Sequence, residues 1–228
     1  MNQHSSIYYS PIYRRFKSFD ENAYRAVVHF YENNEDEISR LEFEEYFDFL
    51  VTYTNALFYS EEYQKHLLMA DAVIETSFEH NVPFFREDDI LEKMLLQKAT
   101  SYYHLMDFKK AVRVLSELIK INPFDTKYIK ILQKCLWFDS PTYIQPIRGF
   151  AIASFLLNAL IIAVHLLVIK SFFPDFDNET AVLRNISLIL GFGLLIVAHG
   201  THAINVWRKS SSILKKARLK KDKTHHYC

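Results

Sequence analysis

Four polar side chains stand within two long apolar stretches, and they are the residues best placed to do chemistry. Asn158 and His165 are seven residues apart, hence on one face of a helix, and His199 and His202 are three apart in the second stretch. An unpaired polar group is costly in hydrocarbon, so a polar residue within a membrane segment is a candidate for a functional role. These groups could carry protons or hold a metal ion. The alternative, which we favour, is that they form hydrogen bonds between packed helices.

Small residues in the same stretches support the packing interpretation. Gly193 and Gly200 are seven residues apart, and Ala159 and Ala163 are four apart, so each helix has a face that lets another backbone approach closely. We therefore expect these faces to pack the two helices together or to join copies of the chain into a homo-oligomer.

Other patterns that carry catalysis or bind cofactors are missing from the sequence. It contains no glycine-rich phosphate loop, no HExxH pair and no CxxC pair, which predicts that the protein is not an enzyme and uses no cofactor or metal. A dense acidic cluster is interpreted as a solvated helix face rather than a metal site; it comprises Glu42, Glu44, Glu45 and Asp48. Two cysteines, Cys135 and Cys228, are too few for a disulfide framework.

The two apolar stretches are long enough to cross a membrane. The first, FAIASFLLNALIIAVHLLVIKSFF, covers residues 150–173, and its first charge is Lys170 near its end. The second, LILGFGLLIVAHGTHAINVW, has no charged residue. About 20 apolar residues suffice to span a bilayer. We predict a transmembrane hairpin over residues 149–207, with helices at 150–173 and 184–207, followed by a basic tail at 208–228.

The charge distribution predicts the orientation of this hairpin. Residues 1–147 carry 16 basic and 23 acidic residues, a net charge of −7, whereas residues 148–228 carry 11 basic and 4 acidic residues, a net charge of +7. Eight of the basic residues follow the second stretch, which marks a cytoplasmic flank. Both termini are therefore expected in the cytoplasm. The net-acidic N-terminal part makes nucleic acid an improbable partner.

A short motif bears on the kind of membrane. The run Gly191-Phe192-Gly193-Leu194 and the later pair His199-Gly200 resemble a short bacterial two-transmembrane domain, although the His-Gly pair comes two residues late. This resemblance favours a bacterial inner membrane.

The part before the hairpin reads as all-α. Helical periodicity predicts six helices within a domain at residues 20–140, after an N-terminal arm at residues 1–19. No strand alternation persists, and the whole chain has four glycines. The first predicted helix begins after Asp20. The other five cover residues 37–58, 61–79, 89–105, 108–121 and 125–137.

Two of these helices form a recognisable pair. Small residues lie where the helices would touch, at Ala99 and Ala111, and larger residues surround that contact; these are Tyr102, Phe108 and Leu115, with Pro123 closing the second helix. The stretch from Leu95 to Pro123 resembles a tetratricopeptide repeat, a helix-turn-helix unit of about 34 residues. Strict periodicity fails one step upstream, where HNVPFFREDD is interpreted as an insertion. A helical bundle without repeats is the alternative.

The resemblance implies a surface that binds an extended peptide or a partner helix. Together with the hairpin, it predicts a membrane-anchored scaffold or adaptor for protein-protein interactions. Two alternatives remain open at this point. The first is a membrane-perturbing effector whose oligomerised hairpin forms a pore, and the second is a small subunit of a larger membrane complex.

Overall fold

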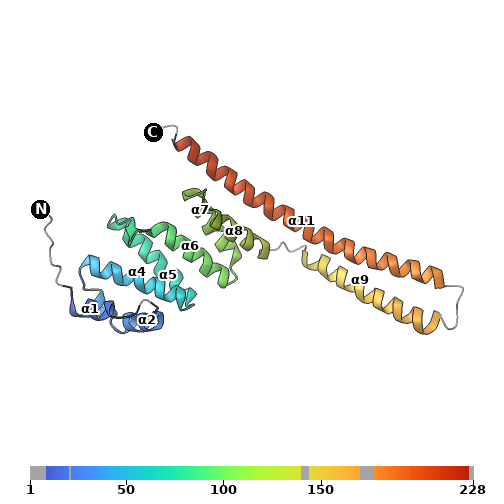
Figure 1. The fold of residues 1–228 in the computed structure, drawn as a ribbon, viewed down its shortest axis with the longest axis horizontal. Helices are drawn as coiled ribbons and strands as arrows, with labels where there is room; N and C mark the ends of the chain where they lie inside the picture. Colours follow the sequence, from blue (N-terminus) through green and yellow to red (C-terminus); the bar gives the residue numbers. More distant parts are fainter. Residues whose placement is uncertain (1–8, 21, 140–143, 170–176, 226–228) are drawn as a thin grey trace. The chain divides into compact units, whose positions relative to one another are not determined.

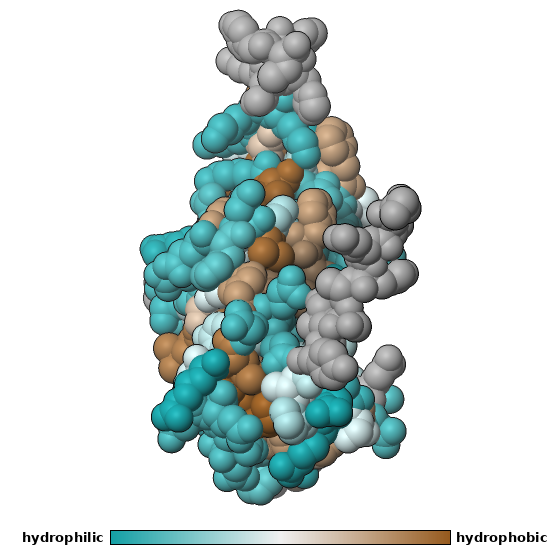
Figure 2. Space-filling model, turned by 90° about the vertical axis from the view of Figure 1, so that its left-hand side faces the viewer, coloured by the Kyte–Doolittle hydropathy of each residue, from teal (hydrophilic) through white to brown (hydrophobic). Residues whose placement is uncertain are grey.

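The protein is all-α, as the sequence predicts. The computed structural model describes residues 9–20, 22–139, 144–169 and 177–225, and 83% of it is helical. The chain divides into two compact units, one comprising Met1–Cys135 with Ala217–Cys228 and the other Leu136–Lys216. The side of the molecule shown in Figure 2 is mostly hydrophilic, with hydrophobic residues in patches between hydrophilic ones.

The first unit starts with three short helices that the sequence analysis only partly anticipated. They are α1 (Pro11–Lys17), α2 (Tyr24–Asn33) and α3 (Glu35–Ile38) (Figure 1). Helix α1 lies in the stretch interpreted as an arm. It folds because Pro11 suits the first helical turn and because Ile12, Tyr13 and Phe16 are buried. The Phe16 ring packs 4.1 Å from that of Phe49, centroid to centroid, within an aromatic-rich core.

Five longer helices follow, and four of them match the predicted positions closely, whereas the first begins six residues later than the predicted start at residue 37. They are α4 (Phe43–Tyr59), α5 (Tyr63–Glu79), α6 (Ile90–His104), α7 (Phe108–Ile121) and α8 (Thr126–Phe138). From α4 to α7, each helix contacts the next in sequence. Asp89 and Asp107 cap α6 and α7 by accepting hydrogen bonds from the backbone N–H groups of Glu92 and Lys110.

The insertion between α5 and α6 forms a small β-hairpin that the sequence did not predict. Strand β1 (Phe84–Phe85) pairs antiparallel with β2 (Asp88–Asp89). The two residues between them, Arg86 and Glu87, have φ angles of 49° and 72°. Both positions of such a two-residue turn require positive φ, which side chains other than glycine adopt at a cost of about 1 kcal/mol or more each. The β-hairpin is therefore stabilised by contacts outside its turn.

Two helices that are long and apolar enough to cross a membrane lie wholly or mostly in the second unit. Helix α9 (Ile144–Val164) continues into a π-helical turn, η1 (His165–Ile169), and α11 (Asp177–His225) runs beside α9 over its first half (Figure 1). The most apolar windows within their candidate membrane spans, Gln145–Leu167 and Asn178–Lys221, have mean hydropathies of 2.3 and 2.1. Only 17% and 12% of their most apolar windows are buried, so protein does not cover these surfaces. The predicted residues 170–173 lie outside the described residues.

Candidate functional site

A groove opens along one side of the first unit, here called the helical unit. Two adjoining pockets form this groove, and both are lined by Tyr59, Asp88 and Lys93. The first pocket, here called the α1 pocket, has a volume of about 580 Å³. Its lining residues come from α1, the segment that follows it, α2, α4, the β-hairpin and the start of α6. The second, the α8 pocket, has a volume of about 510 Å³. Its lining side chains come from α4, the hairpin, α6 and α8; they are Phe58, Tyr59, Glu87, Asp88, Asp89, Glu92, Lys93, Leu96, Gln97, Thr100, Tyr128 and Ile131.

The order of the helices explains why the groove forms. Each of the pairs α4/α5, α5/α6 and α6/α7 packs side by side, so alternate helices come to the same side of the stack. Side chains of α4, α6 and α8 line the α8 pocket, whereas α5 and α7 supply none of its lining residues. The groove therefore results from the stacking of the helices, and it crosses α4, α6 and α8.

Amide side chains of α4 and α6 are hydrogen-bonded to each other in the wall of the groove. Asn55 lines the α1 pocket and Gln97 the α8 pocket, and Gln97 donates a hydrogen bond of 2.8 Å from Nε2 to Oδ1 of Asn55. Gln97 is 6% exposed, and its Oε1 lies 3.4 Å from Nε2 of the fully buried His66. Burial lowers the pKa of His66 to about 4, so its imidazole is neutral near pH 7.

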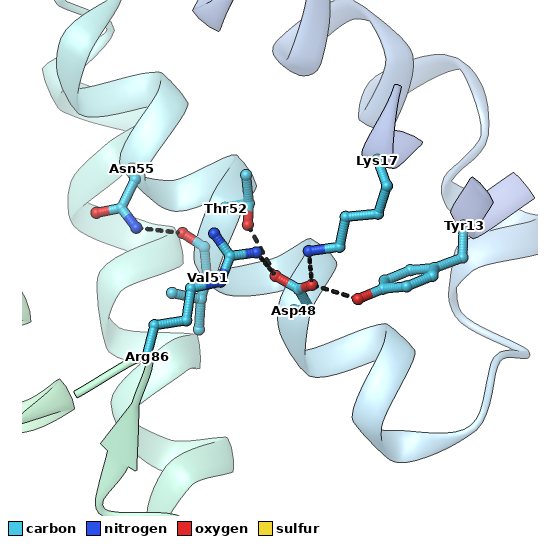
Figure 3. A network of polar contacts seen from close by, with 7 residues as sticks. All are labelled: Tyr13, Lys17, Asp48, Val51, Thr52, Asn55 and Arg86. Atoms are coloured by element: carbon cyan, nitrogen blue, oxygen red, sulfur yellow. Dashed lines mark hydrogen bonds and ion pairs between the residues drawn. The ribbon is translucent and has the colours of Figure 1, made fainter. Parts of the chain in front are cut away.

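A buried carboxylate fixes the other end of the groove. Asp48 on α4 is 5% exposed and receives hydrogen bonds from Tyr13 and Thr52 together with ion pairs from Lys17 and Arg86 (Figure 3). The Arg86 Nη2 atom lies 2.7 Å from Oδ1. Burial alone would raise the pKa of Asp48, but the hydrogen bonds from Lys17 and Tyr13 outweigh it, so this pKa lies below its ordinary value. The carboxylate thereby joins α1, α4 and the hairpin.

The interpretation of the acidic cluster as a solvated helix face is therefore wrong for half of its members. Glu42 and Glu44 are exposed, but Glu45 is 7% exposed and accepts two hydrogen bonds of 2.7 Å, from the backbone N–H and the hydroxyl of Ser10. Glu45 and Asp48 face the N-terminal segment, whose docking supplies the donors that a buried carboxylate needs.

The residues of the predicted helix pair are buried or partly buried in α6, in α7 and just after α7. Ala99, Ala111 and Leu115 are fully buried, and α6 and α7 make the most extensive helix contact in the described residues. Pro123 is also buried, two residues after the end of α7. Tyr102 and Phe108 are partly buried beside this contact, and the Lys110 ammonium lies 5.5 Å from the centroid of the Tyr102 ring.

The four polar residues of the apolar stretches take different positions. Asn158 is 4% exposed and donates a 2.6 Å hydrogen bond to the Arg184 carbonyl on α11. His202 is 2% exposed, and its Nε2 donates to the Trp137 carbonyl at 2.9 Å. His165 is 8% exposed where η1 begins, whereas His199 is exposed. His202 therefore packs within the second unit, whereas His199, one turn earlier on α11, is exposed.

The glycines of α11 also differ from one another. A methyl group on Gly191 would stand 3.2 Å from the Phe155 ring and 3.3 Å from the Ser154 hydroxyl on α9. At Gly193 and Gly200 it would meet no atom of another element within 4 Å. Gly191 thus allows α9 and α11 to approach each other closely. Gly193 and Gly200, the two glycines selected from the sequence, have open space beside them.

Comparisons with known proteins leave the family of this chain open. No family model and no solved structure matches it. The auxilin-like clathrin uncoating factor SWA2 of Saccharomyces cerevisiae is 41% identical over 54 residues, which are 24% of this chain. Those residues are 8% of that protein, so the similarity is limited to a short segment of a much longer chain. In the described part of this protein, no three metal-binding side chains are grouped.

Proposed function

We propose that this protein is a membrane-anchored interaction scaffold whose helical unit, similar to a tetratricopeptide-repeat domain, binds an extended segment of a partner protein in the groove. The observation that carries the proposal is the groove itself, about 510 Å³ at the α8 pocket, with apolar side chains beside the amide of Gln97. Apolar pockets suit the side chains of such a segment.

The apolar pair α9 and α11 supports the anchoring role. Its two spans have the length and composition of membrane helices and little of their surface is covered by protein. We place both termini in the cytoplasm, because the basic residues that follow Trp207 mark the inner side of a membrane. The groove would then face cytoplasmic partners.

Loss of partner capture after a single groove substitution would test this function. Leu96→Arg puts a long charged side chain into the α8 pocket, and Leu68→Arg is a matched control because Leu68 is exposed on α5 and lines neither pocket. The full-length protein is purified from its native membranes in detergent. We expect partners to co-purify with the wild type and with Leu68→Arg and to be lost with Leu96→Arg. Identical co-purifying proteins for all three would contradict the proposal.

A role as a small subunit of a larger membrane complex is a second candidate, favoured by one observation. Gly193 and Gly200 leave open space on α11, where a helix of another protein could approach closely. Replacing both with Leu and measuring association in detergent tests this role. The pore-forming alternative has less support, because Asn158 and His202 donate to backbone carbonyls within the second unit.

A further inference from the structure

The α8 pocket carries an excess of negative charge beside an apolar surface. Its lining includes four acidic side chains and one lysine, a net formal charge of −3. The lysine, Lys93, already pairs with Asp88 at 2.6 Å. In the α1 pocket, by contrast, three basic side chains outnumber two acidic ones. The charge of the groove therefore changes sign along its length.

Three carboxylates of the α8 pocket have no cation partner among the described residues. Glu87 stands at the tip of the hairpin turn and is exposed. Asp89 caps α6 through the backbone N–H of Glu92. Glu92 accepts hydrogen bonds from neutral donors, the Tyr128 hydroxyl and the Asn122 amide, which leave its charge uncompensated.

Apolar side chains stand beside these carboxylates. Leu96 and Ile131 are partly buried in the pocket, and Tyr59 is 54% exposed at its junction with the α1 pocket. An apolar surface next to uncompensated carboxylates is complementary to a segment that presents both a cation and a bulky apolar side chain. Acidic ligands would meet repulsion in the same pocket.

We infer that the α8 pocket takes a lysine- or arginine-bearing segment of a partner protein, with an apolar residue of that segment packed against Leu96 and Ile131. This inference rests on the proposed peptide-binding function and adds the chemical class of the partner. The cationic side chains lie toward Glu87 and Glu92, so the segment binds with its basic part at the α8 end of the groove.

Charge-matched peptides on the intact protein test the inference. The full-length chain is placed in nanodiscs of phosphatidylcholine, which has no net charge, and empty nanodiscs serve as the blank. The probes are two fluorescent peptides of serine, each with one phenylalanine flanked either by lysines or by glutamates. We expect the lysine peptide to bind about tenfold more tightly, and its affinity to fall as salt is added. Equal binding of the two peptides, or no binding of the lysine peptide, would overturn the inference.

A matched pair of substitutions locates the effect. Glu87→Lys reverses a charge in the α8 pocket, and Glu44→Lys makes the same change at an exposed residue that lines neither pocket. Binding of the lysine peptide should weaken about fivefold with the first and remain unchanged with the second. Equal losses would show a nonspecific charge effect and overturn the inference.

Two further outcomes separate this inference from the function on which it depends. If the glutamate peptide binds and Leu96→Arg abolishes its binding, the groove is a peptide site but the charge class is wrong. A photoreactive amino acid at position 87 reports the occupant directly. Cross-links to residues 208–225 of the same chain would make the basic tail the occupant and overturn the assignment to a partner protein.

Discussion

Asp48 holds three parts of the helical unit together through a single side chain. Its carboxylate accepts from Tyr13 and Lys17 of α1 and from Arg86 of the hairpin, and the latter residue lies at positive φ. Asp48→Asn keeps the size of the side chain but removes the charge that both cations contact. Because Lys17 and Arg86 are partly exposed, water can solvate them, and the cost should be about 2 kcal/mol rather than that of a fully buried pair.

Urea unfolding of the full-length protein in detergent, followed by near-ultraviolet circular dichroism, measures this cost. Glu44→Gln is the control because Glu44 is exposed on the same helix, and it should change the free energy of unfolding by less than about 0.5 kcal/mol. A similarly small change for Asp48→Asn would contradict the structural role of this carboxylate.

The buried imidazole of His66 makes a separate prediction about pH. Its pKa is lowered to about 4 in the folded state, whereas an unfolded histidine titrates near 6.5, so between these values the unfolded state binds the extra proton. Stability should therefore fall as pH decreases from about 6.5 to 4, by about 3 kcal/mol in total. The pKa of Asp48 is lowered, so its contribution is lost only at more acidic pH.

His66→Gln should remove most of this pH dependence, while His29→Gln, at an exposed position, should retain it. The measurement is urea unfolding at a series of pH values between 4 and 7. A wild-type free energy of unfolding that stays constant over this range would show that His66 is not buried as described.

The burial of a single residue could be predicted from the sequence where the pattern of neighbouring residues along its helix determines it. Ala99 and Ala111 are small residues on the apolar faces of adjacent helices, and both are fully buried. The burial of Glu45 and Asp48 could not be predicted in this way, because their partners in α1 come 35 residues earlier. The acidic residues alone look like a solvated surface, and only the docked N-terminal segment changes their environment.

At the scale of elements, the helices that bury a continuous apolar face were predicted well, and those that depend on contacts elsewhere were not. The observed bounds of α7, Phe108–Ile121, are those predicted. Helix α1 has seven residues, too few for stability on its own, and needs the buried contacts of Tyr13 and Phe16. The β-hairpin has an Arg-Glu turn in place of the glycine or asparagine that usually signals one.

The strain in that turn can be measured. Glu87→Gly removes the side chain that disfavours a φ of 72°, so the free energy of unfolding should rise by about 1 kcal/mol. Glu44→Gly, within helix α4, should lower it by about the same amount, because glycine weakens a helix. Urea unfolding compares the two variants, and a destabilising effect of both would argue against the described turn.

The hairpin of α9 and α11 shows how helix rotation limits sequence analysis. Spacing placed Gly193 and Gly200 on one face, but it could not show which glycine faces α9, and the close contact occurs at Gly191. Gly191→Val should destabilise the hairpin by about 1 to 3 kcal/mol through overlap with Phe155, whereas Gly193→Val should have little effect. Unfolding in mixed micelles with increasing dodecyl sulfate compares them, and equal stability of both variants would contradict the described packing.

For the whole molecule, the separation of charge between the two ends of the chain predicts how it sits in a membrane. Cysteines at Ser39 and Asn178, both exposed, are introduced into a chain lacking Cys135 and Cys228. A membrane-impermeant thiol reagent on intact cells should label residue 178 directly and residue 39 only after permeabilisation. The reverse pattern would place the groove outside the cell and remove cytoplasmic partners from consideration.

The central claim is that a partner segment occupies the groove of the membrane-anchored protein, and site-specific photo-cross-linking in native membranes tests it most directly. A photoreactive amino acid is placed at Thr100, which lines the α8 pocket, and at Glu75, which is exposed on α5 and lines neither pocket. The account predicts a discrete adduct with another protein from position 100 and none of the same mass from position 75. The same adducts from both positions, or none from position 100, would contradict it.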